Sequence, residues 1–142
     1  MKLLLTYIFL FPSIVLFAQE WQTDFDEAKK MAIEKDRNIV LVFQGSDWCA
    51  PCIKLENEIW STQEFKDYAA DHFVMLKADF PRKRANKLPD TQQEKNNQLA
   101  EKYNSQGFFP FVVVMDNNGK VLGTAGYEKI SPEEYIKLLS SF

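Results

Sequence analysis

An apolar run at residues 39–43 leads within a few positions to two closely spaced cysteines, Cys49 and Cys52. The run, Ile-Val-Leu-Val-Phe, is continuous and rich in β-branched residues, a pattern typical of a strand covered on both faces. After the cysteines, Cys52, Leu55 and Ile59 share one face at helical spacing. A buried strand that passes through a short turn into a helix is a unit of α/β folds, in which helices pack against a sheet.

Three further apolar segments predict strands. Two of them lie at residues 73–78 and 111–115, and the third, at 121–125, follows Asn118 and Gly119. Because Asn and Gly tolerate positive φ, this pair predicts a tight hairpin turn between the last two strands. We therefore expect a central mixed β-sheet of about four to five strands.

Helix-start signals surround these strands. In each, an N-cap residue is followed three positions later by Glu, the pattern of a capping box. The N-cap pairs are Asp24 with Glu27, Ser61 with Glu64, and Ser131 with Glu134.

We interpret the polar and basic residues 81–97 as an insertion or long loop, with a helical end through Leu99, Ala100 and Tyr103.

The N-terminus has the pattern of a secretory signal peptide. Lys2 supplies a positive start, residues 3–17 are almost wholly apolar, and Ala18 suits a cleavage site. We expect residues 1–18 to be a cleaved signal peptide and residues 19–142 to form one domain in a periplasmic or secreted protein. The alternative is an uncleaved membrane anchor, although the apolar run is shorter than the roughly 20 residues of a typical span.

The bulk composition excludes several classes of protein. Two cysteines cannot build a disulfide-rich scaffold, and with His72 they fall short of the four ligands of a structural zinc site. The formal net charge of −3 gives no global attraction to nucleic acid or to an anionic membrane. We interpret His72 as a helix C-terminal residue and the basic run at Arg82, Lys83, Arg84 and Lys87 as a solvated loop, with docking of an acidic partner as the alternative.

The cysteine pair has a specific chemical logic at the start of a helix. The first turn leaves unpaired N–H groups and a partial positive charge, which lower the pKa of a thiol at that end. Cys49 is then the nucleophile of disulfide exchange, and Cys52, one turn later, releases the product. A structural disulfide is the alternative, but so short a loop constrains the unfolded chain little.

The segment Trp48-Cys49-Ala50-Pro51-Cys52 resembles the active-site motif of the thioredoxin superfamily. The segment Phe108-Phe109-Pro110-Phe111 resembles the cis-proline segment of that family, whose backbone pairs with an extended substrate. The resemblance covers residues 24–142 and implies a thioredoxin-like fold. It assigns Cys49 and Cys52 as catalytic thiols, Trp48, Phe109 and Pro110 as substrate-binding residues, and Ala50 and Pro51 as the active-site turn.

The resemblance implies an exported thiol-disulfide oxidoreductase that contributes to cell redox homeostasis. Its partners are protein substrates with disulfides or thiols and an upstream membrane electron donor, with no nucleic acid and no stable membrane insertion after signal cleavage. No cofactor and no metal are required, because the cysteines carry the electrons. Pro51, in the spacer between the cysteines, resembles the proline of the family's reducing members, so the resemblance favours a reductase. The alternatives are a disulfide-forming oxidant, a non-catalytic binding or chaperone module, and a metal-handling protein.

The sequence departs from thioredoxin itself in three places. Phe43 stands six residues before the first cysteine, where thioredoxins carry a buried aspartate that moves protons. Asp47 and Glu56 are the candidate substitutes, and the charge of Asp47 is also expected to oppose the Cys49 thiolate. Phe109 replaces a smaller residue, and the insertion at 81–97 is longer than in the minimal fold.

Overall fold

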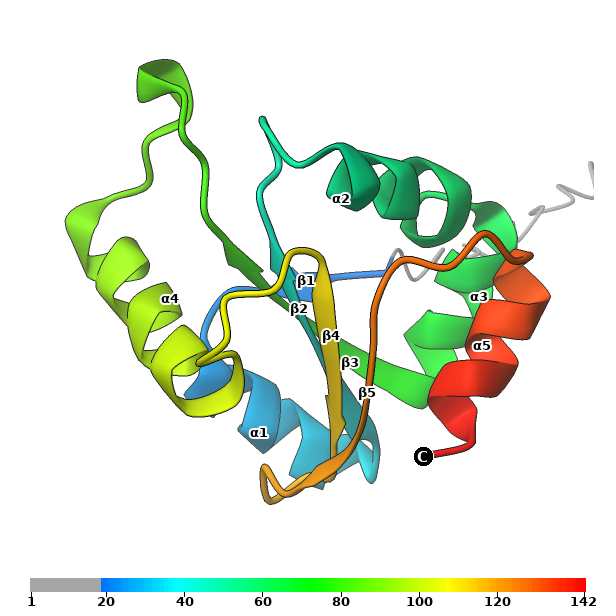
Figure 1. The fold of residues 1–142 in the computed structure, drawn as a ribbon. Helices are drawn as coiled ribbons and strands as arrows, with labels where there is room; N and C mark the ends of the chain where they lie inside the picture. The colour runs from blue at the N-terminus through cyan, green and yellow to red at the C-terminus, as the bar shows by residue number, and fades with distance from the viewer. Residues whose placement is uncertain (1–18) are drawn as a thin grey trace, which may run out of the picture.

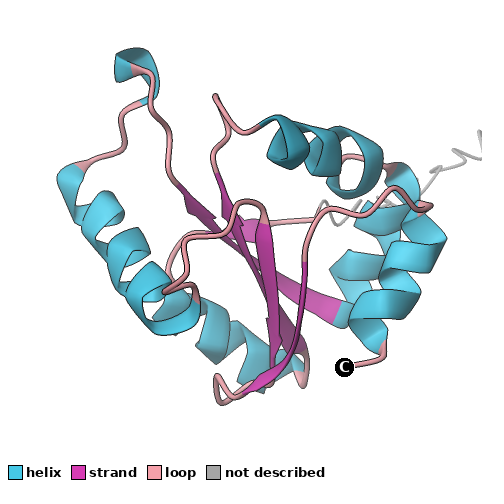
Figure 2. Ribbon diagram, viewed as in Figure 1, coloured by secondary structure: helices cyan, strands magenta, loops and turns pink. Residues whose placement is uncertain are grey.

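The computed structural model describes residues 19–142, which form a mixed five-stranded sheet with helices on both faces (Figure 1, Figure 2). The strand order is β1-β3-β2-β4-β5. In chain order the elements are β1 (Trp21–Gln22), α1 (Phe25–Lys35), β2 (Asn38–Gln44), α2 (Ala50–Leu55), a π-helical turn (Glu56–Trp60), α3 (Gln63–His72), β3 (Phe73–Asp79), a 3₁₀ turn (Arg84–Asn86), α4 (Asp90–Tyr103), β4 (Phe111–Met115), β5 (Val121–Ala125) and α5 (Pro132–Ser140).

The four predicted strands are confirmed, each within a residue or so of its expected bounds. In the sheet, β2 lies between β3, which is parallel to it, and β4, which is antiparallel. The strand β1 was not predicted. It contributes only two residues, which pair with Met75 and Leu76, and so short a segment carries no readable periodicity.

The alternation of side chains along the strands divides the core into two layers. On one face, Val40 and Val42 of β2 pack with residues of α3, α5 and the helical segment after the cysteines, and Trp60 lies at the centre with 1% of its surface exposed. On the other face, Leu41 and Phe43 pack with α1 and α4. Figure 1 shows the two groups of helices on opposite sides of the sheet.

The predicted helix starts are confirmed in two of three cases. Asp24 accepts hydrogen bonds from the first turn of α1, and Ser131 forms a complete capping box at α5. The expected start at Ser61 was wrong by one residue. Thr62 is the N-cap of α3 and accepts a hydrogen bond from Phe65 N–H, whereas Ser61 ends the preceding π-helical turn.

The interpretation of residues 81–97 as a long loop was wrong in its second half. The helix α4 begins at Asp90, because Pro89 supplies a fixed entry φ and the following polar side chains bond along the helix, as Gln93 does to Asn97. The irregular part is residues 80–89, which we call the basic loop.

Three segments gather at the edge of the sheet where the parallel strands β2 and β3 end. They are the start of α2, the basic loop, and residues 104–110 before β4, which we call the proline loop (Figure 1). The ends of parallel strands form a common site for chemistry in α/β folds. The predicted signal peptide, residues 1–18, lies outside the described residues. Among residues 19–142, every helix is too short or too polar to cross a bilayer.

Candidate active site

Cys49 and Cys52 form a disulfide, with their Cα atoms 5.2 Å apart. Cys49 is the N-cap of α2, and its Sγ accepts a hydrogen bond from the Cys52 N–H at 3.3 Å. Pro51 lies in the first turn, where a missing N–H costs nothing. Both cysteines are 4% exposed, while Ala50 and Pro51 between them are exposed. The two buried sulfurs therefore lie beside an exposed turn.

Trp48 connects the residue before the disulfide to both neighbouring loops. Its Nε1 donates a hydrogen bond to the Phe80 carbonyl at 2.7 Å, and its ring meets Phe109 edge-to-face at 5.5 Å. The guanidinium of Arg82 lies 3.6 Å from the centre of the indole, within cation–π range. Gly45 lies against the same ring, and a Cβ at that position would overlap it. Trp48 is thus half-buried and held on several sides.

The carboxylate of Asp47 faces the basic loop. It accepts hydrogen bonds from the N–H groups of Arg82 and Lys83, both at 2.9 Å, and from the Asn86 side chain at 3.0 Å. These bonds, that from Arg82 N–H above all, hold the pKa of Asp47 below its usual range. Since its lone pairs serve the loop, Asp47 is a structural anchor rather than a substitute for the thioredoxin aspartate.

The proline loop contains a cis peptide bond between Phe109 and Pro110, as predicted. Pro110 is buried, Phe109 is half-buried, and Phe108 is 56% exposed. The buried side chain of Asn104 bonds both backbone groups of Phe108, donating to its carbonyl at 2.9 Å and accepting from its N–H at 3.0 Å. The sequence reasoning missed Asn104, since a single polar residue after a helix has no distinctive pattern.

A hollow of about 250 Å³ lies beside Cys52 and is lined by polar side chains, among them Gln44, Glu56 and Lys77. Glu56 accepts a hydrogen bond from Ser61 Oγ at 2.9 Å, whereas its second oxygen is buried without a partner in residues 19–142. Glu56 is therefore a carboxylate that lines the hollow beside Cys52 and has one oxygen without a hydrogen-bond partner in these residues.

The side chain of Phe43 does not line the hollow beside Cys52. Counting residues back from the first cysteine put Phe43 at the position of the thioredoxin aspartate, but its side chain packs in the layer beneath α1 and α4. Because side chains alternate along β2, Gln44 rather than Phe43 lines the hollow beside Cys52. Gln44 and Glu56 therefore line one hollow with Cys52, and Phe109 packs against Trp48, the residue before Cys49. His72 lies apart at the end of α3.

Comparisons with known proteins agree with this architecture. A thioredoxin-like family model matches residues 20–117. The disulfide bond reductase DsbH of Chlamydia pneumoniae is 36% identical over 122 residues, which cover 86% of this chain and 71% of the relative. A solved structure named DsbH oxidoreductase has a TM-score of 0.80 at 32% identity, over 96% of this chain and 92% of that one.

A more distant likeness concerns the fold alone. A disulphide isomerase from Xylella fastidiosa has a TM-score of 0.60 at 23% identity, over 82% of this chain and 86% of its own. The confirmed fold, the disulfide between Cys49 and Cys52 at the start of α2, and the relatives above point to one conclusion. The chain belongs to the thioredoxin-like family and is a thiol-disulfide oxidoreductase.

Proposed function

We propose that this protein is an exported reductase of protein disulfides. The observation that carries the proposal is the Cys49–Cys52 disulfide at the first turn of α2, flanked by a cis-proline loop. The direction towards reduction is supported by Pro51 in the spacer and by the relative that is named a disulfide bond reductase. A disulfide-forming oxidant is the second candidate, because the same cysteine pair serves both directions.

In the proposed cycle the reduced protein attacks its substrate through Cys49. The Cys49 thiolate forms a mixed disulfide with one substrate sulfur, and the other substrate sulfur leaves as a thiol after taking up a proton. The thiolate of Cys52 then attacks Cys49 Sγ, so the second substrate sulfur leaves as a thiol and the protein disulfide forms. Two electrons pass to the substrate, and an upstream membrane electron donor returns two electrons to the protein.

The local structure favours Cys49 as the first nucleophile. Its sulfur lies at the first turn of α2 and accepts a hydrogen bond from the Cys52 N–H, which is of the kind that stabilises a thiolate. Cys52 lies one turn further in and lines the polar hollow. We assign Glu56 the role of accepting the proton of Cys52 when that thiol attacks.

The substrate is proposed to lie across the Ala50–Pro51 turn. Its extended backbone pairs with the residue before Pro110, in the manner of strand addition. The exposed ring of Phe108 and the exposed side chain of Ile53, which is 42% exposed, offer apolar contacts near the disulfide. Trp48 and Phe109 form the half-buried wall beside it.

Residues 1–18 are proposed to be a signal peptide that is cleaved after Ala18, with residues 19–142 as the mature domain. A periplasmic or secreted site is consistent with the apolar N-terminal segment. Such a compartment also supplies substrate proteins with disulfides. Cleavage is tested by N-terminal sequencing of the exported protein, which we expect to begin at Gln19; a protein that begins at Met1 would contradict this assignment.

The reductase activity is tested with the mature protein and a disulfide-bonded protein substrate. We expect catalysed reduction with a low-molecular-weight dithiol as the electron source. The Cys49→Ser variant should be inactive, whereas Cys52→Ser should accumulate a mixed disulfide with the substrate through Cys49. Oxidation of reduced substrates without any reduction would support the oxidant, and full activity in Cys49→Ser would support a binding module.

The role of Glu56 is tested by the Glu56→Gln substitution, which keeps the shape and removes the proton acceptor. We expect attack by Cys52 to slow about a hundredfold near neutral pH, the lower end of the usual range for a general base, and to recover as the pH rises. The matched control is Glu58→Gln, an exposed residue two positions further along. The same pH profile for both variants and the unmodified protein would contradict the assignment.

A further inference from the structure

We propose that the basic loop is a docking surface for an acidic stretch of the substrate protein that lies close to the substrate's disulfide. The proposal rests on the proposed function and adds the class of substrate. The charge of the loop is opposite in sign to the net charge of the protein. Residues 80–89 carry four cations and no carboxylate in a chain whose formal net charge is −3.

The loop is held against the two residues that precede Cys49. The Phe80 carbonyl accepts a hydrogen bond from the Trp48 indole at 2.7 Å, and the Asp47 carboxylate accepts hydrogen bonds from the N–H groups of Arg82 and Lys83. The Arg82 guanidinium lies over the face of Trp48. The first cation of the loop therefore lies over the residue that immediately precedes Cys49, where a substrate presents its disulfide.

The cations of the loop are available to a partner. The residues from Arg82 to Lys87 are all exposed. Within the described part of the chain, Arg82, Lys83 and Arg84 form no ion pair, whereas Lys87 is paired with Asp90 at 3.0 Å. Asp47 accepts hydrogen bonds from two backbone N–H groups and from the side-chain amide of Asn86. It therefore anchors the loop without an ion pair to any of the three unpaired side chains.

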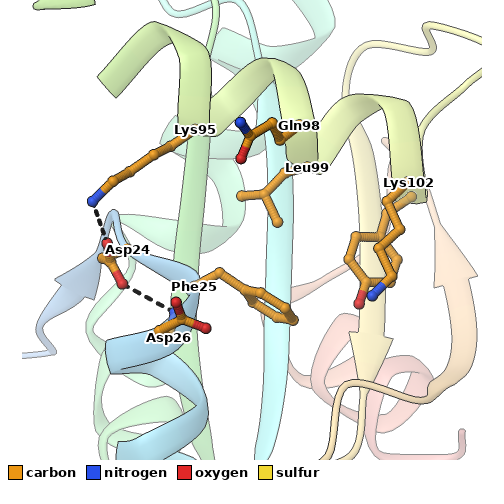
Figure 3. A pocket seen from close by; sticks show the side chains of 8 residues that line it. Asp24, Phe25, Asp26, Lys95, Gln98, Leu99 and Lys102 are labelled. Atoms are coloured by element: carbon orange, nitrogen blue, oxygen red, sulfur yellow. Dashed lines mark hydrogen bonds and ion pairs between the residues drawn. The ribbon is translucent and has the colours of Figure 1, made fainter. Parts of the chain in front are cut away.

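The loop is anchored at its far end as well. Asn96 of α4 donates to the Asp79 carbonyl at the end of β3, and Gln92 donates to the Thr23 carbonyl, both at 2.9 Å. Figure 3 shows Lys95 of α4 paired with Asp24 across a pocket next to the start of α1. A loop fixed at both ends loses little entropy when a partner binds, so its charges are preorganised.

An acidic polypeptide fits this arrangement because the reaction itself brings a polypeptide to the edge. An extended chain advances about 3.3 Å per residue, so carboxylates a few positions from the substrate cysteine reach the loop. Opposite charge raises the rate of encounter, an effect that salt screens.

The test uses two disulfide-containing peptides that differ only in flanking residues, Glu in one and Gln in the other. For the mature protein we expect kcat/KM to be about tenfold higher for the Glu peptide at low salt, and the two values to converge at high salt. The variant Lys83→Gln/Arg84→Gln/Lys87→Gln should lose most of this preference, because it removes three of the four cations of the loop. It keeps Arg82 over Trp48 and the backbone N–H groups that bind Asp47, so it should reduce the Gln peptide and hydroxyethyl disulfide at the normal rate.

The matched control removes three exposed lysines elsewhere, in the variant Lys30→Gln/Lys66→Gln/Lys120→Gln. It should keep the preference for the Glu peptide. Equal kcat/KM for both peptides in the mature protein, or an undiminished preference in the loop variant, would overturn the proposal.

A binding measurement separates this proposal from the proposed function. The oxidised protein is titrated with a cysteine-free Glu-rich peptide and followed by calorimetry, so no turnover is needed. Binding that the loop variant loses and the control variant keeps supports the docking surface even if no disulfide is reduced. Absence of binding to the mature protein at low salt counts against it even if the reductase activity is found.

Discussion

The proline loop is fixed from inside the protein by the buried amide of Asn104, whereas the basic loop is fixed at the surface by the carboxylate of Asp47. Both loops contact Trp48, through Phe109 on one side and Phe80 on the other. The first presents the ring of Phe108 and carries no charge, and the second carries four cations. In the proposals above, the proline loop positions the substrate backbone and the basic loop selects the substrate by its charge.

The largest effect is expected from removing the anchor of the proline loop. Asn104→Ala leaves both backbone groups of Phe108 without their partner, and we expect a loss of about 2 kcal/mol in the free energy of unfolding. Reduction of all protein substrates should fall together, since the loop positions every substrate. Chemical denaturation and kcat/KM measure the two effects.

Asn57→Ala is the matched control, because Asn57 is exposed. Its stability should change little. If Asn104→Ala were as stable and as active as this control, the proline loop would not depend on the buried amide.

A smaller and more local effect is expected at the basic loop. Asp47→Ala removes the acceptor of Arg82 N–H and Lys83 N–H, so these two amides should exchange with solvent at least tenfold faster. The amide of Phe108 in the proline loop should keep its protection. Hydrogen exchange followed by NMR resolves these sites.

The substitution Asp71→Ala, at another exposed carboxylate, serves as the control and should leave all three amides unchanged. Loss of protection in both loops after Asp47→Ala would show that they are a single unit, contrary to the comparison above.

The two loops should also differ in their response to acid. The hydrogen bonds from the basic loop, chiefly Arg82 N–H, hold the folded pKa of Asp47 below its unfolded value of about 3.9. Its contribution is therefore complete above that unfolded value and is lost as the pH falls through the folded pKa. Asn104 carries no charge, so the proline loop should not respond in this range.

An NMR titration of the Asp47 carboxyl and of the Arg82 and Phe108 amides checks this difference. We expect a carboxyl midpoint below about 3.9, with the Arg82 amide following it. A carboxyl midpoint above that value would contradict the assigned anchors. A transition that the Phe108 amide follows and the Arg82 amide does not would contradict them as well.

Local sequence signals predicted the fold well where they were strong. The apolar run of β2, the turn at Gly119 and the capping box at Ser131 have mechanisms that act over a few residues, and all three are confirmed. β1 was missed because two residues carry no periodicity. At α3, Ser61 and Thr62 are adjacent N-cap candidates, and only the geometry of the preceding turn decides between them.

The parts of the site that were not predicted depend on tertiary contacts. The alternation along β2 placed Phe43 away from Cys52, which counting residues from the cysteine cannot detect. Asn104 and the bonds from Asp47 join segments that are distant in sequence or lack a pattern. The motif Trp48–Cys52 identified the chemistry, whereas the surroundings that tune it required the structure.

The central claim is that Cys49 and Cys52 form a reversible, reducing redox pair, and its most direct test is the reduction potential of that pair. The mature protein is equilibrated in dithiothreitol or glutathione buffers, and the dithiol fraction is measured. We predict a value near that of thioredoxin, about −270 mV. A value near about −120 mV, typical of a strong oxidant, or the absence of reversible exchange would contradict the claim.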